Sequence, residues 1–406
     1  LFKMFRKNLF NIIFLLVLMA FCLSGCGKKS DGTESTEETA PVIENGSETV
    51  SDPNAYSDFQ EAAAENASTE SEKTFSSGLI AEYDHESSYG MKREEKDNMI
   101  RSYLTGKFVD KKIGERRPIA VMLNNIVDAQ PMSGTSMADV LYECVVEGSL
   151  TRMMGIFENY DDLDKIGSVR SCRNYFVYYA LEFDAIYCHY GQSAYAMPLL
   201  SQDFVDNLSG LSSEGDTVFY RTTDRVAPHN AYASAKGIKK GIEIKGYDNN
   251  YSSDFKGKFT FANDDEIIIP DSPDSYDAVH VEPGYLINKP WFDYDEASGK
   301  YLRYEYDEPQ VDGENNEQLA VDNIILQYSS WEVVDEKGYL GFDCHSGGKM
   351  TYITHGKARD GSWIRFDGDT GSVRYFDNNG NEIVMNQGKT WILIIQDTLS
   401  DKVVIT

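Results

Sequence analysis

Apolar residues in the folded part of this chain come in short runs that polar turns separate. Continuous apolar runs at 119–123, 139–146 and 152–157 predict three buried strands, and Glu147-Gly148-Ser149 between the last two predicts a tight hairpin. The aromatic-rich stretch 173–183 contains no Gly or Pro, which favours a helix packed against these strands. The first elements of the fold are therefore strands followed by a covering helix.

The next stretch mixes both kinds of element. Residues 184–190 predict a further strand, and 194–207 and 230–242 predict two more helices. Strands and helices do not alternate regularly, so a parallel βαβ fold is not indicated. We expect the α+β class, with a partly antiparallel sheet.

Strand patterns dominate from Tyr247 onward. Asn and Gly residues at 377–381 predict a hairpin turn, because both residue types tolerate positive φ. We therefore expect an N-terminal α+β domain at 79–270 and a separate β-rich domain at 271–406. The short strands predicted in the second domain and just before it lie at 259–261, 278–281, 300–306, 323–328, 339–343, 349–354, 363–366, 373–376, 382–385 and 391–395.

The first 25 residues have the pattern of an export signal. Basic residues at 3, 6 and 7 precede an apolar run at 12–23, which is too short to span the roughly 30 Å hydrocarbon core of a bilayer. The run ends in Leu-Ser-Gly-Cys, which resembles the lipobox of bacterial lipoproteins, in which Cys26 carries the lipid. The alternative is an ordinary signal peptide with an incidental cysteine. The lipobox predicts a lipid anchor on the extracytoplasmic face of the cell membrane.

Residues 26–78 have the composition of a tether. Between residues 27 and 78 there are twelve acidic and three basic residues and few large apolar ones, too few to offset the entropy of ordering. We predict a disordered acidic spacer, with a binding role for the acidic segment as the alternative.

Overall charge narrows the class of partners. The 406 residues include 66 Asp and Glu against 38 Lys and Arg, which gives a formal net charge of -28. Such a chain repels phosphate backbones, so nucleic acid is excluded as a partner. The hydrophobic content of 41% is sufficient for a folded core.

Motifs for common cofactors and metals are missing from the sequence. It contains no CxxC, HExxH, GxSxG, Walker loop or Gly-rich dinucleotide turn, and we therefore expect no metal site and no cofactor. Cys144 and Cys188 lie in apolar runs, where a buried thiol is common. Cys172 lies between Ser171 and Arg173 near a predicted helix start, a position that can lower the pKa of a thiol.

Several polar residues follow predicted strands or precede predicted helices, where a scaffold can hold a binding group at the surface. Arginines near a helix start suit a carboxylate or phosphate, so these residues predict one concave anion-binding face. The alternative is that each arginine pairs with one of the many acidic side chains. The predicted ligand-binding residues are Asn125, Arg152, Arg170, Arg173, Arg225 and Asn230.

A second set of residues has acid–base chemistry. Glu147 at the hairpin could act as a general acid beside His189 or His229, with a solvated surface carboxylate and a satisfied core histidine as the alternatives. Glu143 shares a strand face with Glu147, but about 13 Å would separate them along an ideal strand. That exceeds the roughly 5 to 9.5 Å used by glycoside hydrolases, so the two do not form a catalytic pair.

Longer motifs resemble one family. They include Ala120 to Asn125, Ile166 to Arg173, Ala227 to Asn230 and, near the C-terminus, Gly388 to Trp391. These stretches resemble the YerB-like lipoproteins, a two-domain family of unknown function, over roughly residues 102–396. The resemblance implies an exported two-domain lipoprotein of a Gram-positive bacterium and supplies no reaction.

Two functions from different classes follow. The first is a binding or scaffold lipoprotein that recognises an anionic glycan or peptide at the cell envelope, with an envelope protein as a second kind of partner. The second is a peptidoglycan-remodelling enzyme that uses Glu147 with His189 or His229.

Overall fold

The computed structural model describes residues 93–406, which belong to one compact unit. The predicted signal peptide, the acidic tether and Cys26 lie outside the described residues. Among residues 93–406, none of the helices has both the length and the apolar character needed to cross a membrane.

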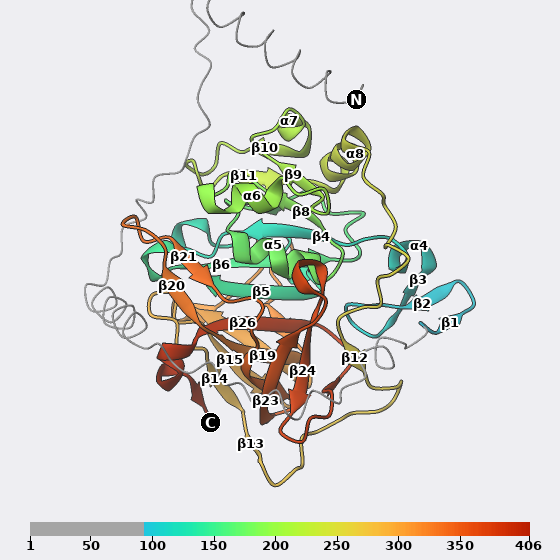
Figure 1. The fold of residues 1–406 in the computed structure, drawn as a ribbon, viewed down its shortest axis with the longest axis vertical. Helices are drawn as coiled ribbons and strands as arrows, with labels where there is room; N and C mark the ends of the chain where they lie inside the picture. The colour runs from blue at the N-terminus through green and yellow to red at the C-terminus, as the bar shows by residue number, and fades with distance from the viewer. Residues whose placement is uncertain (1–92) are drawn as a thin grey trace, which may run out of the picture. The chain divides into compact units, whose positions relative to one another are not determined.

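One sheet organises the described residues (Figure 1). Its central strands are almost fully buried, because their apolar runs leave no polar face for solvent. Within residues 93–406 the sheet has eleven strands, in the order β13 (Ser275–Asp277), β23 (Lys357–Arg365), β22 (Gly348–Thr354), β19 (Asn323–Ser329), β26 (Thr390–Gln396), β5 (Val140–Val145), β6 (Thr151–Phe157), β4 (Ile119–Leu123), β8 (Ile186–His189) and β9 (Asn207–Ser209), with β24 (Val373–Asp377) paired to β23.

The two halves of the sequence meet inside this sheet. Strand β26, from the C-terminal half, pairs in parallel with β5, from the N-terminal half, with Ile392 opposite Tyr142. Figure 1 shows the red β26 beside the blue-green β5. The expectation of a separate β-rich domain is therefore wrong in one respect, because the main sheet runs without interruption through both halves. The apolar run that ends the sequence forms a central strand.

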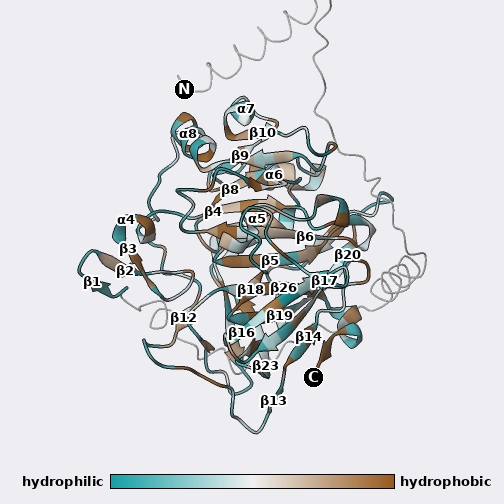
Figure 2. Cartoon of the chain, turned by 180° about the vertical axis from the view of Figure 1, so that it is seen from behind, coloured by the Kyte–Doolittle hydropathy of each residue, from teal (hydrophilic) through white to brown (hydrophobic). Residues whose placement is uncertain are grey.

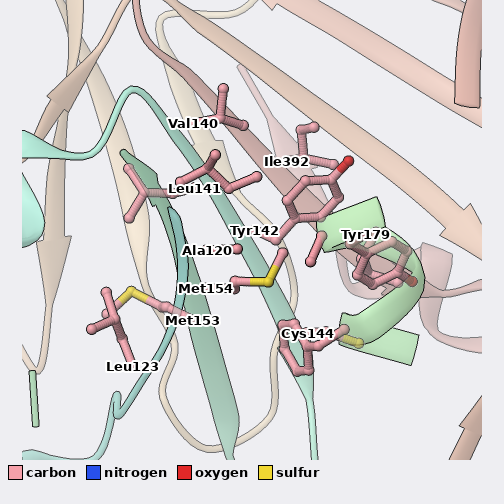
Figure 3. Packing of buried hydrophobic residues seen from close by; sticks show 14 of the residues in the cluster. Ala120, Leu123, Val140, Leu141, Tyr142, Cys144, Met153, Met154, Tyr179 and Ile392 are labelled. Atoms are coloured by element: carbon pink, nitrogen blue, oxygen red, sulfur yellow. The ribbon is translucent and has the colours of Figure 1, made fainter. Parts of the chain in front are cut away.

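Helix α5 (Asn174–Leu181) covers one face of the sheet, as its aromatic residues predict. The rings of Tyr179 and Tyr142 stack with centroids 4.7 Å apart, beside Cys144 and Met154 (Figure 3). Just after the helix, Glu182 accepts a hydrogen bond of 2.6 Å from the Tyr142 hydroxyl and forms ion pairs with Lys258 and Arg365. This closed charge cluster links the N-terminal half to the C-terminal half.

A smaller sheet covers the opposite face. Side chains alternate along a strand, so Tyr142 points to α5 while Glu143 points to the smaller sheet. There Phe292 packs edge-on against Trp391 of β26, with centroids 5.3 Å apart. The strands are β17 (Glu308–Pro309), β16 (Lys300–Glu305), β15 (Trp291–Asp295), β14 (His280–Glu282) and β27 (Val404–Ile405), with β18 (Ala320–Val321) beside β16; several are labelled in Figure 2, where hydrophobic residues concentrate in the central strands.

Shorter elements surround this two-sheet core. The short strands are β1 (Glu95–Lys96), β2 (Met99–Arg101), β3 (Phe108–Asp110), β7 (Ile166–Gly167), β10 (Phe219–Arg221), β11 (Ala231–Ala233), β12 (Thr260–Phe261), β20 (Trp331–Val333), β21 (Leu340–Phe342) and β25 (Val384–Met385). The remaining helices are α4 (Lys111–Gly114), α6 (Met197–Leu200), α7 (Gly215–Val218) and α8 (Ala235–Lys245), and the 3-10 turns are η2 (Val127–Ala129), η3 (Thr135–Met137), η4 (Glu147–Ser149), η5 (Ala194–Ala196), η6 (Gly368–Thr370) and η7 (Asp397–Lys402).

Two predicted helices are shorter than expected. The helix predicted at 194–207 ends at Leu200, because the chain then turns to place β9 in parallel beside β8. The helix predicted from residue 230 begins only at Ala235, since residues 231–233 are paired as a strand between β10 and β7. Ser234 caps the start of α8 by accepting a hydrogen bond of 3.1 Å from the amide of Gly237. Tertiary pairing overrides helix propensity at both places.

Candidate functional site

One edge of the main sheet collects polar residues. Strands β4, β5 and β8 run in the same direction, with β6 antiparallel between β5 and β4. Their carboxyl ends therefore meet at one edge, where Asn125 follows β4, Glu147 follows β5 and His189 ends β8. Such an edge, at the carboxyl ends of parallel strands, is a common place for ligand sites.

Asn125 is the centre of a buried hydrogen-bond network at this edge. Its Nδ2 atom shares two N–H groups among three acceptors: Glu143 Oε1 at 3.0 Å, Thr151 Oγ1 at 2.8 Å and Glu305 Oε1 at 2.8 Å. The Thr151 hydroxyl donates in turn to Glu143 Oε1 at 2.8 Å. Asn125 therefore holds one carboxyl group from the main sheet and one from the smaller sheet around a single nitrogen.

The other polar atoms of Asn125 are also bonded. Its main-chain carbonyl accepts hydrogen bonds from Asn288 Nδ2 at 2.6 Å and from the Tyr306 hydroxyl at 2.9 Å. Its Oδ1 atom accepts from Gln310 Nε2 at 3.2 Å. Asn288, Tyr306 and Gln310 all belong to the C-terminal half, so the side chain that was predicted to bind a ligand also joins the two halves.

Arg303 supplies the positive charge of the network. Its Nη1 atom lies 3.0 Å from Glu143 Oε2, and its Nη2 atom lies 3.6 Å from Glu305 Oε1. The guanidinium also donates to Gln310 and lies 4.2 Å from the ring centroid of Trp391. Arg303 and Glu143 are fully buried, which makes this a desolvated ion pair with compensating contacts.

A pocket of about 360 Å³ adjoins this network. It opens to the surface, since Glu308 and Pro309 are exposed and Val127 is 59% exposed. Apolar side chains line most of it, while two glutamates and two glutamines supply polar groups. We name it the Glu305 pocket; its lining residues are Val127, Gln130, Pro131, Glu305, Tyr306, Glu308, Pro309, Gln310 and Val311.

The carboxyl group of Glu305 connects the network with the pocket. Only 3% of Glu305 is exposed, and Gln310 donates to its Oε2 atom at 2.9 Å. Burial raises the pKa of Glu305 well above the usual range; the nearby Arg303 opposes this shift, and the negative Glu143 adds to it. The carboxyl group of Glu305 is therefore more readily protonated than an exposed one, and it lies beside a pocket and in contact with an ionic pair.

Arg225 supports the wall of this pocket. Its guanidinium donates to the carbonyls of Ala129 and Pro131, the latter at 2.8 Å. Its role in the structure is to hold the segment that carries Gln130 and Pro131, both of which line the pocket. Asn230, which was predicted to lie on the same face, accepts a hydrogen bond of 2.8 Å from Arg221 and donates to the carbonyl of Thr222.

Glu147 and Arg173 pair with each other. Two hydrogen bonds of 2.7 and 2.5 Å join the guanidinium to both carboxyl oxygens. Burial by itself would raise the pKa of Glu147, but the charge and hydrogen bonds of Arg173 outweigh it and the pKa is lowered. In this structure Glu147 is therefore an ion-pair partner of Arg173, which is the alternative stated for the arginines.

The two histidines have partners of their own. His189 is buried, with Nδ1 2.7 Å from the Gly191 carbonyl and Nε2 3.3 Å from Asn207 Oδ1. Burial lowers the pKa of His189, so it is a neutral core histidine at pH 7. His229 contacts Asn124 through Nδ1, at 2.9 Å from Asn124 Nδ2. The catalytic roles predicted for Glu147, His189 and His229 stay predictions.

Arg152 and Arg170 are buried beside these residues. Arg152 donates to the carbonyl of Ser171 at 2.9 Å, and the carbonyl of Arg170 accepts from the amide of Tyr190 at 3.1 Å. Burial raises the pKa of the Cys172 thiol to about 12, so its position near α5 does not activate it. Within residues 93–406 no group of three His, Cys, Asp or Glu side chains is placed to hold a metal ion.

Comparison with known proteins gives the family. Residues 104–248 match the family described as "Protein of unknown function (DUF3048) N-terminal domain", and residues 281–392 match its C-terminal domain. "Putative lipoprotein YerB" of Bacillus subtilis (strain 168) is 33% identical over 300 residues, which cover 73% of this chain and 87% of that protein. The chain belongs to the YerB-like family.

The fold of this chain is also similar to the crystal structure of YerB from Bacillus subtilis. It is similar with a TM-score of 0.66 and 30% identity, over 75% of this chain and 99% of that one. These findings confirm the resemblance to YerB-like lipoproteins and the two-part organisation of the sequence. The family description assigns no function.

The Glu305 pocket lies where the two family segments meet. Asn125, Glu143 and Thr151 come from the first segment, whereas Arg303 and Glu305 come from the second. The sequence pointed to Asn125 but missed Arg303, Glu305 and Gln310. One signal was present, because Arg303 and Glu305 share a strand face with the buried Tyr301. Leu302 and Tyr304 lie on the opposite face of the same strand and are apolar or aromatic, so the sequence did not show which of the two faces is buried.

Proposed function

We propose that this YerB-like protein is anchored on the extracytoplasmic face of the membrane and binds a cell-wall fragment, a glycan or a peptide, in the Glu305 pocket. The observation that carries the proposal is an open pocket of about 360 Å³ beside a buried polar network centred on Asn125. Pockets of this size, with apolar walls and few converging polar groups, are typical of small-ligand sites. The anchor would be the lipid on Cys26, which the intact mass of the membrane-extracted chain tests.

The charge of the ligand differs from the prediction made from the sequence. An anion would have to bind arginines, yet Arg173 is paired with Glu147 and Arg225 holds two carbonyls. The pocket itself is lined by Glu305 and Glu308. The part of the ligand that enters the pocket is therefore neutral or cationic.

Blocking the mouth of the pocket tests this function. Val127→Trp places a large ring at an exposed position of the lining, where the fold can tolerate it. The full chain in lipid nanodiscs is incubated with a muramidase digest of Bacillus subtilis peptidoglycan, and retained fragments are identified by mass spectrometry. We expect Val127→Trp to lower retention at least tenfold.

A matched control is available in the same chain. Val226 is 81% exposed and lies outside the pocket lining, so Val226→Trp adds the same ring to the surface and leaves the pocket open. Its retention is expected to equal that of the wild type. Equal retention by both variants, or no fragment retained by the wild type, would overturn the proposed function.

A further inference from the structure

We propose that the Glu305 pocket selects ligands by a primary ammonium group, which binds at the Glu305 carboxyl. This inference rests on the proposed function. The chemical class is therefore an amine-bearing peptide or amino sugar. Neither the family description nor the names of the relatives assign such a site.

The lining of the pocket accepts a cation. Among its nine residues, all within the described part of the chain, are two glutamates and no Lys, Arg or His. Two guanidinium groups adjoin the lining: that of Arg303 is held by Glu143, Gln310 and Trp391, and that of Arg225 is held by the carbonyls of Ala129 and Pro131. A cation that enters the pocket thus meets carboxyl and amide oxygens with no competing positive charge in the lining.

The network contains two carboxyl groups and one guanidinium group, so one further positive charge would balance it when both carboxyl groups are ionised. Glu143 and Arg303 cancel each other, so the network is neutral while Glu305 keeps its proton. The charged and titratable side chains around Glu305 are Glu143 on β5, Arg303 on β16, Glu308 on β17 and the Tyr306 hydroxyl. When an ammonium group binds, Glu305 can ionise, one proton goes to solvent, and the new ion pair lies at a largely buried position.

An anion and an uncharged group fit less well. An anion next to Glu305 would have to face Glu143 as well, in surroundings of low dielectric constant. A sugar hydroxyl can use the amides of Gln130 and Gln310 but gains nothing from a carboxyl that is ready to ionise. The net charge of -28 also concentrates cations near the surface.

Calorimetry with a defined pair of probes tests the inference. Lysinamide carries two ammonium groups, and its diacetylated form keeps the shape of the chain without the charges. We expect the full chain in detergent to bind lysinamide at least tenfold more tightly than the diacetylated probe. Repeating the titration in two buffers of different ionisation enthalpy should show that close to one proton is released per ligand bound. When the titration is repeated at several pH values, the affinity for lysinamide should rise by up to tenfold per pH unit below the pKa of Glu305.

Two glutamates of the same pocket provide the variants. Glu305→Gln, which has the shape of the protonated acid, should lower lysinamide affinity at least tenfold and abolish proton release. Glu308→Gln, at the exposed rim, should lower it less than threefold, since solvent screens that charge.

The outcomes separate the inference from the proposed function. If the diacetylated probe binds as tightly as lysinamide, or if binding by the wild type releases no proton, the ammonium inference is wrong. Retention of wall fragments that Val127→Trp abolishes would then still support the pocket as a binding site. The proton measurement uses the wild type, so it stands even where a variant fails to fold.

Discussion

Two buried charge clusters lie on opposite faces of the main sheet and differ in what surrounds them. On the α5 face, Glu182 is held between Lys258 and Arg365, with all three side chains at most 1% exposed. On the other face, Arg303 is held between Glu143 and Glu305, and Glu305 also lines a pocket. All side chains of both clusters are at most 1% exposed, and the difference is that the second cluster includes a residue of the pocket lining. We call the first the closed cluster and the second the open cluster.

In the proposed function the closed cluster has a structural role and the open cluster has a binding role. The closed cluster has two cations for one carboxylate, and Lys258 adjusts because burial lowers its pKa to about 8. The open cluster has two carboxyl groups for one cation, and Glu305 adjusts in the opposite direction. In each cluster burial shifts the pKa of one member toward the value that favours its uncharged form. Only the open cluster has a member that lines the Glu305 pocket, where the proposed ammonium group would take the place of the Glu305 proton.

Removal of the central carboxylate of the closed cluster should have the largest effect. Glu182→Ala leaves Lys258 and Arg365 buried without their partner, and we expect a loss of about 3 to 5 kcal/mol in the free energy of unfolding, measured in urea. Glu305→Gln is the control, with an expected loss below about 1 kcal/mol, because glutamine has the same shape and burial favours the uncharged form of Glu305. Equal losses in the two variants would show that the clusters do not differ.

Lys258 should give stability a characteristic dependence on pH. Between its lowered pKa of about 8 and the ordinary value of 10.5, the unfolded chain binds more protons at this site than the folded chain. The contribution of Lys258 to stability therefore increases as pH rises through this window, by up to roughly 3 kcal/mol.

The comparison is made between wild type and Lys258→Met, by urea unfolding at several values from pH 7 to 10. Cysteines and tyrosines titrate in both chains and cancel in the difference. We expect the wild type to gain on the variant as pH rises above 8. A constant difference would mean that Lys258 stays charged in the folded protein.

Arg225→Ala should have the smallest effect of the variants. It should affect the Glu305 pocket and leave the closed cluster unchanged. It removes two hydrogen bonds to carbonyls behind the pocket wall, which predicts a loss of about 1 kcal/mol in stability and a two- to fivefold weaker retention of wall fragments. Arg221→Ala is the control: Arg221 bonds to Asn230, and its removal should leave retention unchanged. Weaker retention in both variants would show that Arg225 has no specific role in the wall.

Local patterns in the sequence predicted much of the sheet and part of the site. The runs at 119–123 and 152–157 form β4 and β6 as expected, and Glu147 to Ser149 turns between β5 and β6. Asn125 was expected at a strand end with a binding role, and it lies at the centre of the network beneath the pocket. Its partners could not be predicted in the same way, because Glu305 is 180 residues away and reaches it only through the packing of two sheets.

By itself the sequence determined the central strands β4, β5 and β6, the α5 helix, the acidic character of the chain and its family. These depend on residues that are close together in the chain, where the period of apolar positions and turn chemistry decide the outcome. Only the tertiary structure decided that β26 completes the sheet beside β5, that Arg173 is neutralised by Glu147, and that Glu305 shares Asn125 with Glu143. The physical reason is that burial and long-range pairing set the charge of an ionisable side chain, and neither is encoded in its immediate neighbours.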